Sequence, residues 1–477
     1  MKPLPLRRRW TREALRDFFD RLAPVRARWR SPGYHAELRR NYQFFIPPGA
    51  RVLQIGCGIG DLLAELQPSF GVGVDFSPEM IRQARQRHPE PSLHFVEQVA
   101  EELALDYPPF DYIILSDTLT FLEDIVAVLR ELRPYCHART RIITNFFSRL
   151  WQPALWLAEQ LGLRYPQPML NWVTSPDVSN LLELAGFEVV LRDSRILLPT
   201  AWPVIAPFCN RVLATLPLLR HFCLTNWIVA RLPMSLPETT GVSIVVPCRN
   251  EADNIPDVVR RWPALPGPSE IIFVEGHSSD DTWARCEQLV RDNPHRSIQA
   301  LRQQGKGKGD AVRLGFAAAR HEILVILDAD LTVPPEEVTG FVEVLTRGHA
   351  EFVNGSRLLY PMDDEAMRFL NLLANKTFAW MFSWLLGQSV KDTLCGTKVL
   401  LRSDYLRLAE QRAYFGDIDP FGDFDLIFGA AKLGLKMRDY AIRYRARTYG
   451  TTQIRRFRDG WALLKLYLWA IVKMKWR

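Results

Sequence analysis

Short apolar runs of strand length alternate with longer amphipathic stretches on both sides of one break in this chain. The break is the segment from Leu232 to Thr240, LPMSLPETT, where two prolines and several small polar residues interrupt the pattern. An alternation of buried strands with amphipathic helices is typical of an α/β unit with a largely parallel sheet. The chain is therefore predicted to form two α/β domains, with residues 233–240 as the linker between them.

This chain of 477 residues is longer than one hydrophobic core supports, because single cores rarely grow beyond about 250–300 residues. Its composition, 48% hydrophobic and 24% charged, excludes disordered and collagen-like classes. Seven cysteines occur singly, without C-x-x-C spacing, so neither a zinc site nor a disulfide framework is expected. No stretch reaches the roughly 18 apolar residues of a membrane-spanning helix, and the start, MKPLPLRRRW, lacks the apolar core of a secretory signal. A cytoplasmic location is therefore expected.

The first unit carries a glycine-rich turn directly after a predicted strand, Arg51 to Ile55. Gly56, Gly58 and Gly60 form this turn, and Asp75 ends the next predicted strand, 19 positions after Gly56. Glycines let the backbone approach a ligand closely, and an acid at that distance can accept both hydroxyls of a ribose, so the layout indicates a nucleoside-binding crevice. Asp61 stands where a dinucleotide-binding turn has its third glycine, which argues against NAD. On these residues alone, the glycines could also form a simple turn and Asp75 a helix cap.

Three segments in this order, VLQIGCGIGDLLAEL, GVGVDFSPEMIRQAR and FDYIILSDTLTFLEDI, resemble the class I S-adenosylmethionine-dependent methyltransferases. The resemblance implies a Rossmann-like fold over residues 1–232, with a core at 45–145 and an acceptor-binding part at 146–232. It implies S-adenosylmethionine as the cofactor, bound by Gly56, Gly58, Gly60, Asp75, Phe76, Ser116 and Asp117. The family usually has an aspartate beside the adenine, where this chain has Val99. The alternative is therefore a cofactor-binding or scaffolding module without methyl transfer.

The remainder of the first unit contains two unusually apolar stretches, ILLPTAWPVIAPF from Ile196 and LATLPLLRHF from Leu213. Prolines and an arginine interrupt this part of the chain, so neither stretch can form a helix that spans a membrane. They are predicted to be core helices of the acceptor-binding part. The alternative is a lid that faces a membrane or a greasy acceptor.

In the second unit, Asp328 and Asp330 stand two positions apart where a predicted buried strand, Ile323 to Leu327, runs out into a polar loop. At that spacing in an extended chain both carboxylates project from the same face, which suits one divalent cation such as Mg²⁺ or Mn²⁺. Such a cation can stabilise the charge that appears on a departing nucleotide diphosphate. The alternative is that each aspartate only caps the turn or the helix that PPEE begins.

Six segments between Val242 and Arg402 resemble, in order, the family 2 glycosyltransferases, and among them the polyprenyl-phosphate sugar transferases that include the dolichyl-phosphate mannose and glucose synthases. The segments are VSIVVPCRNEADNI, IIFVEGHSSDDTW, GKGKGDAVRLGFAAA, ILVILDADLTVPPEE, NGSR and KDTLCGTKVLLR. The resemblance implies a GT-A fold over residues 241–477 and inverting transfer from a nucleotide-sugar donor. The implied acceptor is a lipid phosphate, a glycolipid or another glycan.

The same resemblance implies roles for individual residues. Those for substrate binding are Pro247, Asn250, Glu251, Glu275, Lys306, Lys308, Asp328, Arg357, Asp392 with Gly396, and Arg447; those for metal binding are Asp328 and Asp330; those for catalysis are Asp330, Asp423 and Asp425. A phosphate acceptor is already ionised and needs no base, whereas an alcohol acceptor would need one of the last two acids. The alternative for that pair is a helix N-cap.

Two departures from the family pattern are visible. Many members have two adjacent aspartates where this chain has Glu275 and Gly276, and the polyprenyl-phosphate members have Ser and Lys where it has Thr452 and Gln453. The first departure concerns which nucleotide base is bound, and the second concerns how the acceptor phosphate is bound.

The formal net charge of +7 is unevenly distributed. Residues 1–30 carry +7 and residues 432–477 carry +11, so the part between them carries −11. Cationic ends suit anionic lipid surfaces or phosphorylated acceptors. The last segment, GWALLKLYLWAIVKMKWR, has the make-up of an interfacial helix with basic anchors, and the alternative is a helix packed on its own domain. Peripheral contact with the cytoplasmic face of an anionic membrane is therefore expected. A nucleic-acid partner is not expected, because a glycosyltransferase domain would have no role in the methylation of a nucleic acid.

Overall fold

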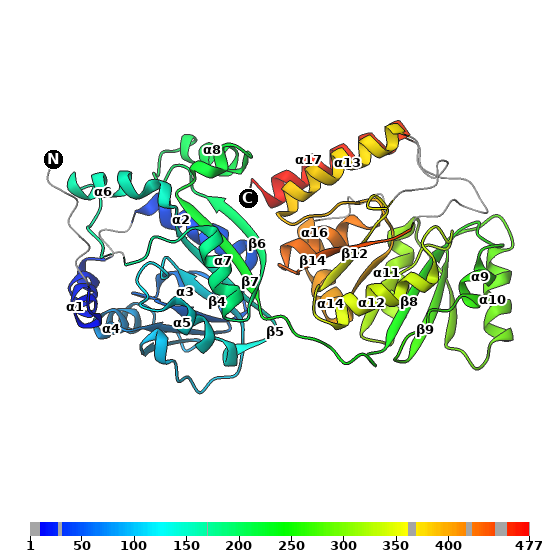
Figure 1. Ribbon diagram of the computed structural model, residues 1–477, viewed down its shortest axis with the longest axis horizontal. Coiled ribbons are helices and arrows are strands. Elements are labelled where there is room, and N and C mark those ends of the chain that lie inside the picture. Colours follow the sequence, from blue (N-terminus) through cyan, green and yellow to red (C-terminus); the bar gives the residue numbers. More distant parts are fainter. Residues whose placement is uncertain are drawn as a thin grey trace. The chain divides into compact units, whose positions relative to one another are not determined.

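The computed structural model describes residues 10–26, 31–168, 170–360, 369–415, 422–443 and 456–476. The chain divides into two compact units, Met1–Pro233 with Lys475–Arg477, and Met234–Met474 (Figure 1). Each unit contains one seven-stranded sheet with helices packed on it. The predicted α/β class with two domains is therefore confirmed.

The sheet of the first unit has the strand order β3-β2-β1-β4-β5-β7-β6. Its strands are β1 (Arg51–Ile55), β2 (Phe70–Asp75), β3 (Leu93–Glu97), β4 (Phe110–Ser116), β5 (Cys136–Phe147), β6 (Glu188–Arg195) and β7 (Thr225–Arg231). The strands from β3 to β5 run parallel, but β7 is antiparallel to both β5 and β6. The sheet is thus mixed but largely parallel, as predicted, because only β7 runs against the other six strands.

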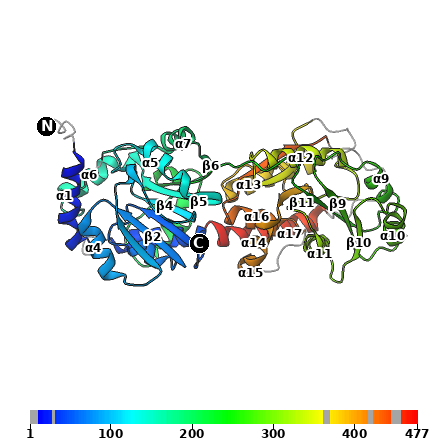
Figure 2. The ribbon, with the colours of Figure 1, turned by 90° about the horizontal axis from the view of Figure 1, so that it is seen from below.

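Helices cover both faces of this sheet, so its central strands are buried on both sides. The helices are α1 (Arg12–Leu22), α2 (Pro32–Phe45), α3 (Asp61–Glu65), α4 (Pro78–Arg87), α5 (Ile125–Glu131), α6 (Gln152–Gln160), α7 (Ser175–Leu184) and α8 (Ile205–Arg211). Helices α5 and α7 pack on one face, where Leu129 and Leu182 share a cluster with Ile228 (Figure 2). Helix α2 packs on the other, where the Tyr42 ring lies 4.8 Å from that of Trp227. Neighbouring residues of β7 thus serve opposite faces, as the two-residue period of a strand requires.

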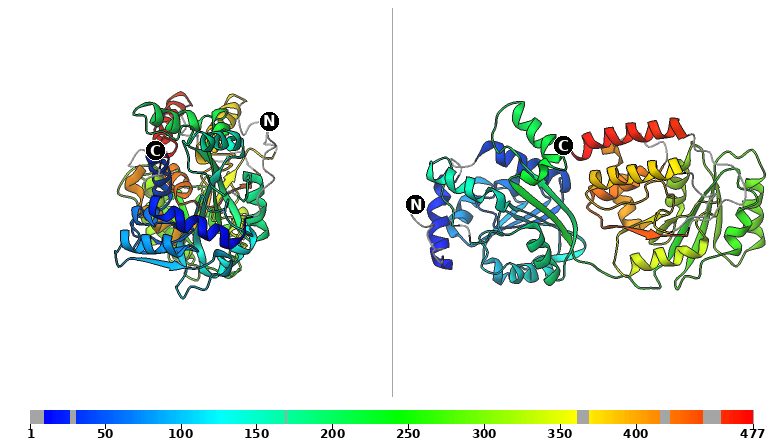
Figure 3. Two further views of the ribbon diagram at one scale, coloured as in Figure 1. Left: turned by 90° about the vertical axis from the view of Figure 1, so that its left-hand side faces the viewer. Right: turned by 45° about the horizontal axis from the view of Figure 1, so that its top comes forward.

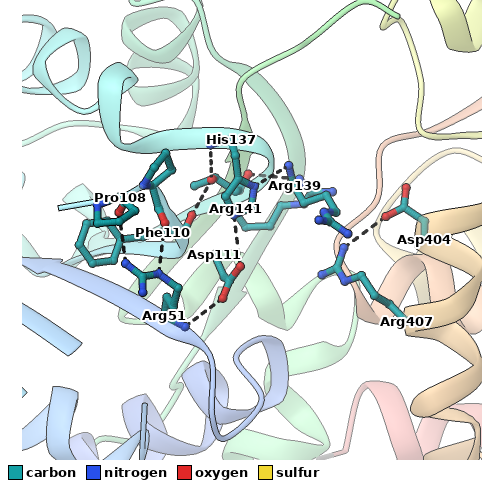
Figure 4. A network of polar contacts seen from close by, with 11 residues as sticks. Arg51, Pro108, Phe110, Asp111, His137, Arg139, Arg141, Asp404 and Arg407 are labelled. Carbon is teal, nitrogen blue, oxygen red and sulfur yellow. Dashed lines mark hydrogen bonds and ion pairs between the residues drawn. The ribbon is translucent and has the colours of Figure 1, made fainter. Parts of the chain in front are cut away.

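A polar network ties together the amino ends of three strands in the first unit (Figure 4). The backbone N–H of Arg51 donates to Asp111 Oδ2 at 2.9 Å, and His137 Nε2 lies 3.2 Å from Asp111 Oδ1. The hydroxyl of Thr140 donates to the carbonyl of Phe110 at 2.6 Å. These bonds fix β1, β4 and β5 at one edge of the sheet. The carboxyl edge is left to the loops that form the candidate site.

The sheet of the second unit has the strand order β10-β9-β8-β11-β13-β12-β14. Its strands are β8 (Val242–Cys248), β9 (Ser269–Glu275), β10 (Ile298–Arg302), β11 (Ile323–Ile326), β12 (Phe352–Ser356), β13 (Lys398–Leu401) and β14 (Met437–Ala441). The first four in the spatial order are parallel, whereas β13 is antiparallel to β11 and β12. This sheet is therefore mixed as well.

The helices of the second unit form a layer on each face of its sheet. They are α9 (Ile255–Arg260), α10 (Thr282–Asp292), α11 (Lys308–Ala318), α12 (Val338–Thr346), α13 (Phe369–Leu386), α14 (Arg402–Glu410), α15 (Arg412–Phe415), α16 (Phe424–Lys432) and α17 (Arg456–Met474). Helices α9, α10 and α12 pack on one face, and α11, α13, α14, α16 and α17 on the other. Helices α13 and α17 lie side by side (Figures 1 and 3).

The final helix packs on its own domain with one side and leaves large apolar side chains exposed on another. Helix α17 buries Leu463, Leu466 and Ala470 in the core of the second unit, while Trp461 and Leu468 are more than half exposed. Within the described ranges, no helix is both long and apolar enough to cross a membrane.

The two apolar stretches that follow β6 do not form the predicted core helices. Helix α8 forms within the first of them, yet the side chains of Val204, Ile205 and Phe208 are 80%, 53% and 54% exposed. In the second stretch, Leu218 is 81% and Phe222 is 55% exposed. The prediction of core helices is therefore wrong, because apolar composition alone does not determine which face of a segment another element covers.

Candidate active sites

The glycine-rich turn and Asp75 of the first unit are joined by hydrogen bonds. Strands β1 and β4 are neighbours in space, and β2 lies on the far side of β1, which is the arrangement of a topological switch point. Asp75 ends β2, and its carboxylate accepts from the N–H of Gly58 at 2.8 Å and from the N–H of Ser77 at 3.0 Å. Gly56 and Gly58 have φ angles of +67° and +54°, which favour glycine. At Gly56 a side chain would also meet Thr118, whereas a Cβ on Gly58 would meet no atom within 4 Å.

Asp75 is 8% exposed, and burial raises the pKa of its carboxyl group to about 6, against the effect of the two backbone donors. One oxygen accepts a hydrogen bond from Gly58 of the turn and the other from Ser77 after β2, and each keeps a second lone pair for a ligand. This arrangement suits a ribose, whose two neighbouring hydroxyls can each donate to one carboxylate oxygen.

A cavity of about 560 Å³ opens at this carboxyl edge, a volume within the range of roughly 300–1,000 Å³ that is typical of small-molecule sites. Six of the seven residues predicted to bind the cofactor line it, namely Gly56, Gly58, Asp75, Phe76, Ser116 and Asp117. Val99 lines it too, at the position where an adenine contact is expected. Gly60 lies behind the turn instead, against the ring of Phe95. The volume and the acceptor groups fit a nucleoside cofactor.

The same cavity is also lined by Asp117, the centre of a buried polar cluster. The hydroxyl of Tyr34 donates to Asp117 Oδ2 at 2.8 Å, and the amide of Asn145 donates to Asp117 Oδ1 at 2.6 Å. Asp117 has a φ of +55°, a strained conformation that an aspartate tolerates better than most residues. Burial raises its pKa to about 6, and the Tyr34 hydroxyl and the charges of Arg26 and Arg164 oppose that effect. A carboxylate held in this way can receive or orient an acceptor group.

Sequence reasoning missed the partners of Asp117. Tyr34 lies on α2, far from the motifs along the chain, and Arg164 follows α6, where its guanidinium lies 5.3 Å from the centre of the Phe147 ring. Only Asn145 left a signal, as an amide inside the apolar run ITNFF at the end of a strand.

In the second unit, one lysine joins two of the predicted carboxylates. The ammonium nitrogen of Lys308, the first residue of α11, lies 2.6 Å from Asp328 Oδ1 and 3.6 Å from Asp423 Oδ2. A Cβ on Gly396 would overlap with the Lys308 ammonium and the Asp328 carboxylate, so any larger residue there would displace this pair. Lys398, which begins β13, is fully buried and places its ammonium 3.9 Å from Asp423 Oδ2. Sequence reasoning missed Lys398, although a lysine at the start of the apolar run KVLL was a visible signal.

The charges of this cluster support one another. Burial alone would raise the pKa of Asp328, but the ammonium of Lys308, with the charges of Lys398 and Arg357, lowers it overall. Burial would lower the pKa of Lys308, and the carboxylates of Asp328 and Asp423 raise it overall. Both members of the pair are therefore charged at neutral pH. About a quarter of each side chain is exposed, so a ligand can reach them.

Asp330 takes part in a tight turn. Its Oδ1 accepts from the N–H of Thr332 at 3.1 Å and from the hydroxyl of Thr332 at 2.7 Å. Among the residues that the structure describes, no three His, Cys, Asp or Glu side chains converge in a way that could hold a metal ion. Mg²⁺ and Mn²⁺ prefer oxygen ligands, so Asp328 and Asp330 fit such a cation when a diphosphate supplies further oxygens.

The residues predicted to bind the nucleotide lie in two loops that are joined by hydrogen bonds. The N–H of Asn250, after β8, donates to the Ser278 hydroxyl at 3.1 Å, and the N–H of Ser278 donates to the buried carboxylate of Glu275 at the end of β9. Glu251 follows in the first loop, and Pro247 lies on β8 opposite Val274 of β9. The two loops form one wall at the carboxyl edge of the sheet, beside β11.

The other predicted substrate residues are placed differently. Arg357 and Asp392 form a buried ion pair in which Nε and Oδ2 are 2.7 Å apart, and the Arg357 charge also acts on Asp328. Lys306 is exposed in the glycine-flanked loop. Arg447 lies outside the described residues.

The structure separates the two acids that the sequence groups as catalytic. Asp423 is the N-cap of α16 and faces Lys308, whereas Asp425 Oδ2 lies 3.5 Å from Arg412 Nε of α15. Residues two apart at a helix start point in different directions, which explains the separation. The two predicted catalytic acids therefore have different charged partners, and the role of each stays a prediction.

Comparisons with known proteins bear on each unit. Residues 243–409 match the family model for glycosyl transferase family 2, and residues 52–137 match that for a methyltransferase domain. The glycosyltransferase AglJ of Haloferax volcanii is 29% identical over 49% of this chain and 73% of its own length. A second relative is an undecaprenyl-phosphate 4-deoxy-4-formamido-L-arabinose transferase of Pectobacterium carotovorum, which is 30% identical. The match covers 34% of this chain and only 48% of that relative.

A solved structure of magnesium protoporphyrin IX methyltransferase from Synechocystis is also similar to part of this chain. It is 18% identical, with a TM-score of 0.33, over 46% of this chain and 99% of its own. The two matched regions fall in the two units on either side of Pro233. The protein is thus a transferase that combines a methyltransferase domain, at residues 52–137, with a family 2 glycosyl transferase domain, at residues 243–409.

Proposed function

We propose that the second unit transfers a sugar from a nucleotide-sugar donor to a polyprenyl phosphate, or to a related glycolipid or glycan, with inversion at the anomeric carbon. The observation that carries this proposal is the Lys308–Asp328–Asp423 cluster beside the bonded loops after β8 and β9. The acceptor class is supported by the undecaprenyl-phosphate transferase, which is 30% identical over the part that it shares with this chain.

In this proposal the loops that contain Asn250, Glu251 and Glu275 hold the nucleoside, and Lys308 faces the diphosphate. A divalent cation held by Asp328 and Asp330 would supply further positive charge to the leaving group. The acceptor oxygen attacks the anomeric carbon from the opposite side, as in inverting glycosidases. A phosphate acceptor needs no base, so Asp423 then orients Lys308; for an alcohol acceptor, Asp423 would take the proton.

The two acids of the FGDFD segment are expected to differ sharply on substitution. Asp423→Asn removes a charge that faces Lys308 and should lower the rate of sugar transfer by about a hundredfold, the usual effect of losing one electrostatic contact in an active site. Asp425→Asn removes a charge that faces Arg412 and not Lys308, so it should leave the rate within about threefold. The rates are measured as nucleoside diphosphate release with polyprenyl phosphate and a panel of nucleotide sugars. Equal losses in the two variants would refute the assignment.

We propose that the first unit binds S-adenosylmethionine and transfers its methyl group to an acceptor beside Asp117 in the same cavity. The supporting observation is that one cavity joins the turn at Gly58 and Asp75 to the polar cluster around Asp117. A scaffolding module that only binds the cofactor would need the turn and Asp75, but it would not need the polar cluster around Asp117. Methyl transfer requires mainly alignment of acceptor and cofactor, which one continuous cavity provides.

Binding of the cofactor is expected to weaken in acid. The pKa of Asp75 is raised to about 6, so the acid is ionised above that pH and protonated below it, where it loses acceptor capacity for ribose hydroxyls. Affinity for S-adenosylhomocysteine should fall by up to about tenfold for each unit below pH 6. Calorimetry between pH 5 and pH 8 measures this, and Asp75→Asn should bind weakly without that dependence. An affinity that stays constant over the whole range in the unsubstituted protein would contradict the role of Asp75.

We propose further that both activities serve one product, a sugar or glycolipid that is also methylated, and that the protein works at the cytoplasmic face of an anionic membrane. In the second unit this is supported by the exposed Trp380 of α13 and the exposed Trp461 and Leu468 of α17, which lies beside it. Lys465 and Lys473 on α17 suit anionic head groups. Separate modification of unrelated acceptors by the two units would remove the coupling.

A further inference from the structure

The first unit carries an exposed apolar surface that its proposed chemistry does not explain. It is made by residues 150–163, around α6, and residues 202–222, around α8, and is called the α6–α8 surface. Its exposed side chains include Trp156, Leu161, Leu163, Val204, Phe208 and Leu218, whose exposed fractions range from 49% to 81%. Contiguous apolar patches on soluble proteins mark sites of interaction with a protein, a ligand or a membrane.

The two segments form one continuous surface. The indole N–H of Trp151 donates to the carbonyl of Phe222 at 2.8 Å, and the N–H of Ser148 donates to the carbonyl of Leu224 at 2.8 Å. Helices α6 and α8 accordingly lie along the same side of the unit in Figure 1. None of the nine residues of α6 is buried, although a helix of that length is marginally stable without packing. The outer face of α6 therefore lacks the cover that would normally stabilise it.

The charges of these segments select the kind of partner. From Ile196 to Leu224 the sequence contains no Asp or Glu, and its basic side chains are Arg211, Arg220 and His221. From Phe146 to Leu163 the charged residues are Arg149 and Glu159, and Glu159 is largely buried in an ion pair with Arg164. Exposed apolar side chains among basic residues suit a bilayer of anionic lipids, whose acyl region takes the apolar groups and whose phosphates meet the cations.

The cavity of the first unit opens into this surface. Leu155, Ala158 and Leu163 from one segment line the cavity, as do Pro199 and Thr200, which precede the other. Leu163 is 77% exposed and also lines the cavity, so it stands at the mouth. The mouth of the cavity and the exposed apolar side chains therefore belong to the same surface.

We propose that the α6–α8 surface docks on an anionic lipid bilayer, and that the cavity receives a methyl acceptor that is anchored in this bilayer. The second part rests on the proposed methyl transfer. The first part is independent of it, because docking needs only the surface.

Cys209 allows a test in the full-length protein. It lies on α8 and is partly exposed, whereas the other six cysteines are buried, and all seven lie in described ranges. An environment-sensitive fluorophore is attached to Cys209, and vesicles of phosphatidylcholine and phosphatidylglycerol with brominated acyl chains are added. Quenching is expected, because the brominated chains reach only a label that enters the bilayer, and a label at this position reports on the first unit alone.

Matched variants locate the effect. The double substitution Val204→Ser with Leu218→Ser removes two side chains that are 80% and 81% exposed, so it should leave the fold intact and raise the vesicle concentration for half-quenching at least tenfold. Leu184→Ser, on α7 outside this surface, removes a side chain that is 58% exposed and should leave quenching unchanged. Pure phosphatidylcholine vesicles should quench far less.

Absence of quenching in the unsubstituted protein, or equal quenching in the double variant, would overturn the docking proposal. A lipid-free dimer that the double variant dissociates, together with an unquenched label, would assign the surface to a second copy of the chain. Calorimetry with S-adenosylhomocysteine on the same samples separates the two parts. Quenching without cofactor binding would retain the docking surface and refute methyl transfer. Cofactor binding without quenching would retain the proposed methyl transfer and refute the docking surface.

Discussion

Asp328→Asn should lower the rate of sugar transfer by about a thousandfold while the second unit stays folded. The carboxylate of Asp328 faces Lys308 at 2.6 Å, and its side chain is 27% exposed, so it is available to the donor and to a cation. Asp330 is a less direct target, because its carboxylate also closes the turn with Thr332. Substitution of Asp330 by Ala should likewise abolish transfer, but it changes the loop as well as the candidate cation site.

The measurement is the initial rate of nucleoside diphosphate release during a titration with Mn²⁺ or Mg²⁺. Asp257→Asn, which removes an exposed acid of α9 that pairs with Arg260, is the matched control and should keep the full rate. Circular dichroism checks that each variant is folded. A full rate for Asp328→Asn, or for the unsubstituted protein in excess chelator, would contradict the assigned cation site.

Gly58→Arg should abolish binding of S-adenosylhomocysteine, with a loss of affinity of more than about a hundredfold. A Cβ on Gly58 meets no atom within 4 Å and faces the cavity, so the long side chain would occupy the space of the ligand. Gly49→Arg is the matched control: its φ is +81°, its Cβ position is equally open, and it lies at the amino end of β1.

Both variants share the cost of a side chain at positive φ, so their difference reports the cavity alone. Calorimetry measures the heat of binding, and thermal unfolding shows whether each variant is folded. Unchanged binding by a folded Gly58→Arg protein would show that the cofactor does not occupy the cavity.

Local signals in the sequence predicted the parts of the sites that lie on continuous strand ends. The strand Arg51 to Ile55 is observed with the predicted bounds, and the turn after it meets Asp75 because parallel neighbours bring their carboxyl ends to one edge. The parts assembled by tertiary structure were not predictable in this way. Tyr34 reaches Asp117 across 83 positions, and nothing near either residue announces the contact.

Asp423 and Asp425 are close in sequence, but the start of α16 turns them in different directions, so the pattern of two acids does not predict their different charged partners. The apolar stretches after β6 were predicted to be core because hydrophobicity scales describe composition and not the cover that a segment receives. Their exposure is what identifies the α6–α8 surface.

The central claim is that one chain carries both a sugar transferase acting on a lipid phosphate and a methyltransferase. Mass spectrometry tests it directly, after incubation of the full-length protein with polyprenyl phosphate, a panel of nucleotide sugars, a divalent cation and S-adenosylmethionine that carries an isotopic label in its methyl group. We expect a lipid phosphate that has gained a sugar in a reaction that Asp328→Asn abolishes, and a labelled methyl group on the lipid-linked product that Gly58→Arg abolishes. A lipid phosphate left unchanged by every donor, or a product that never acquires the label, would contradict the account.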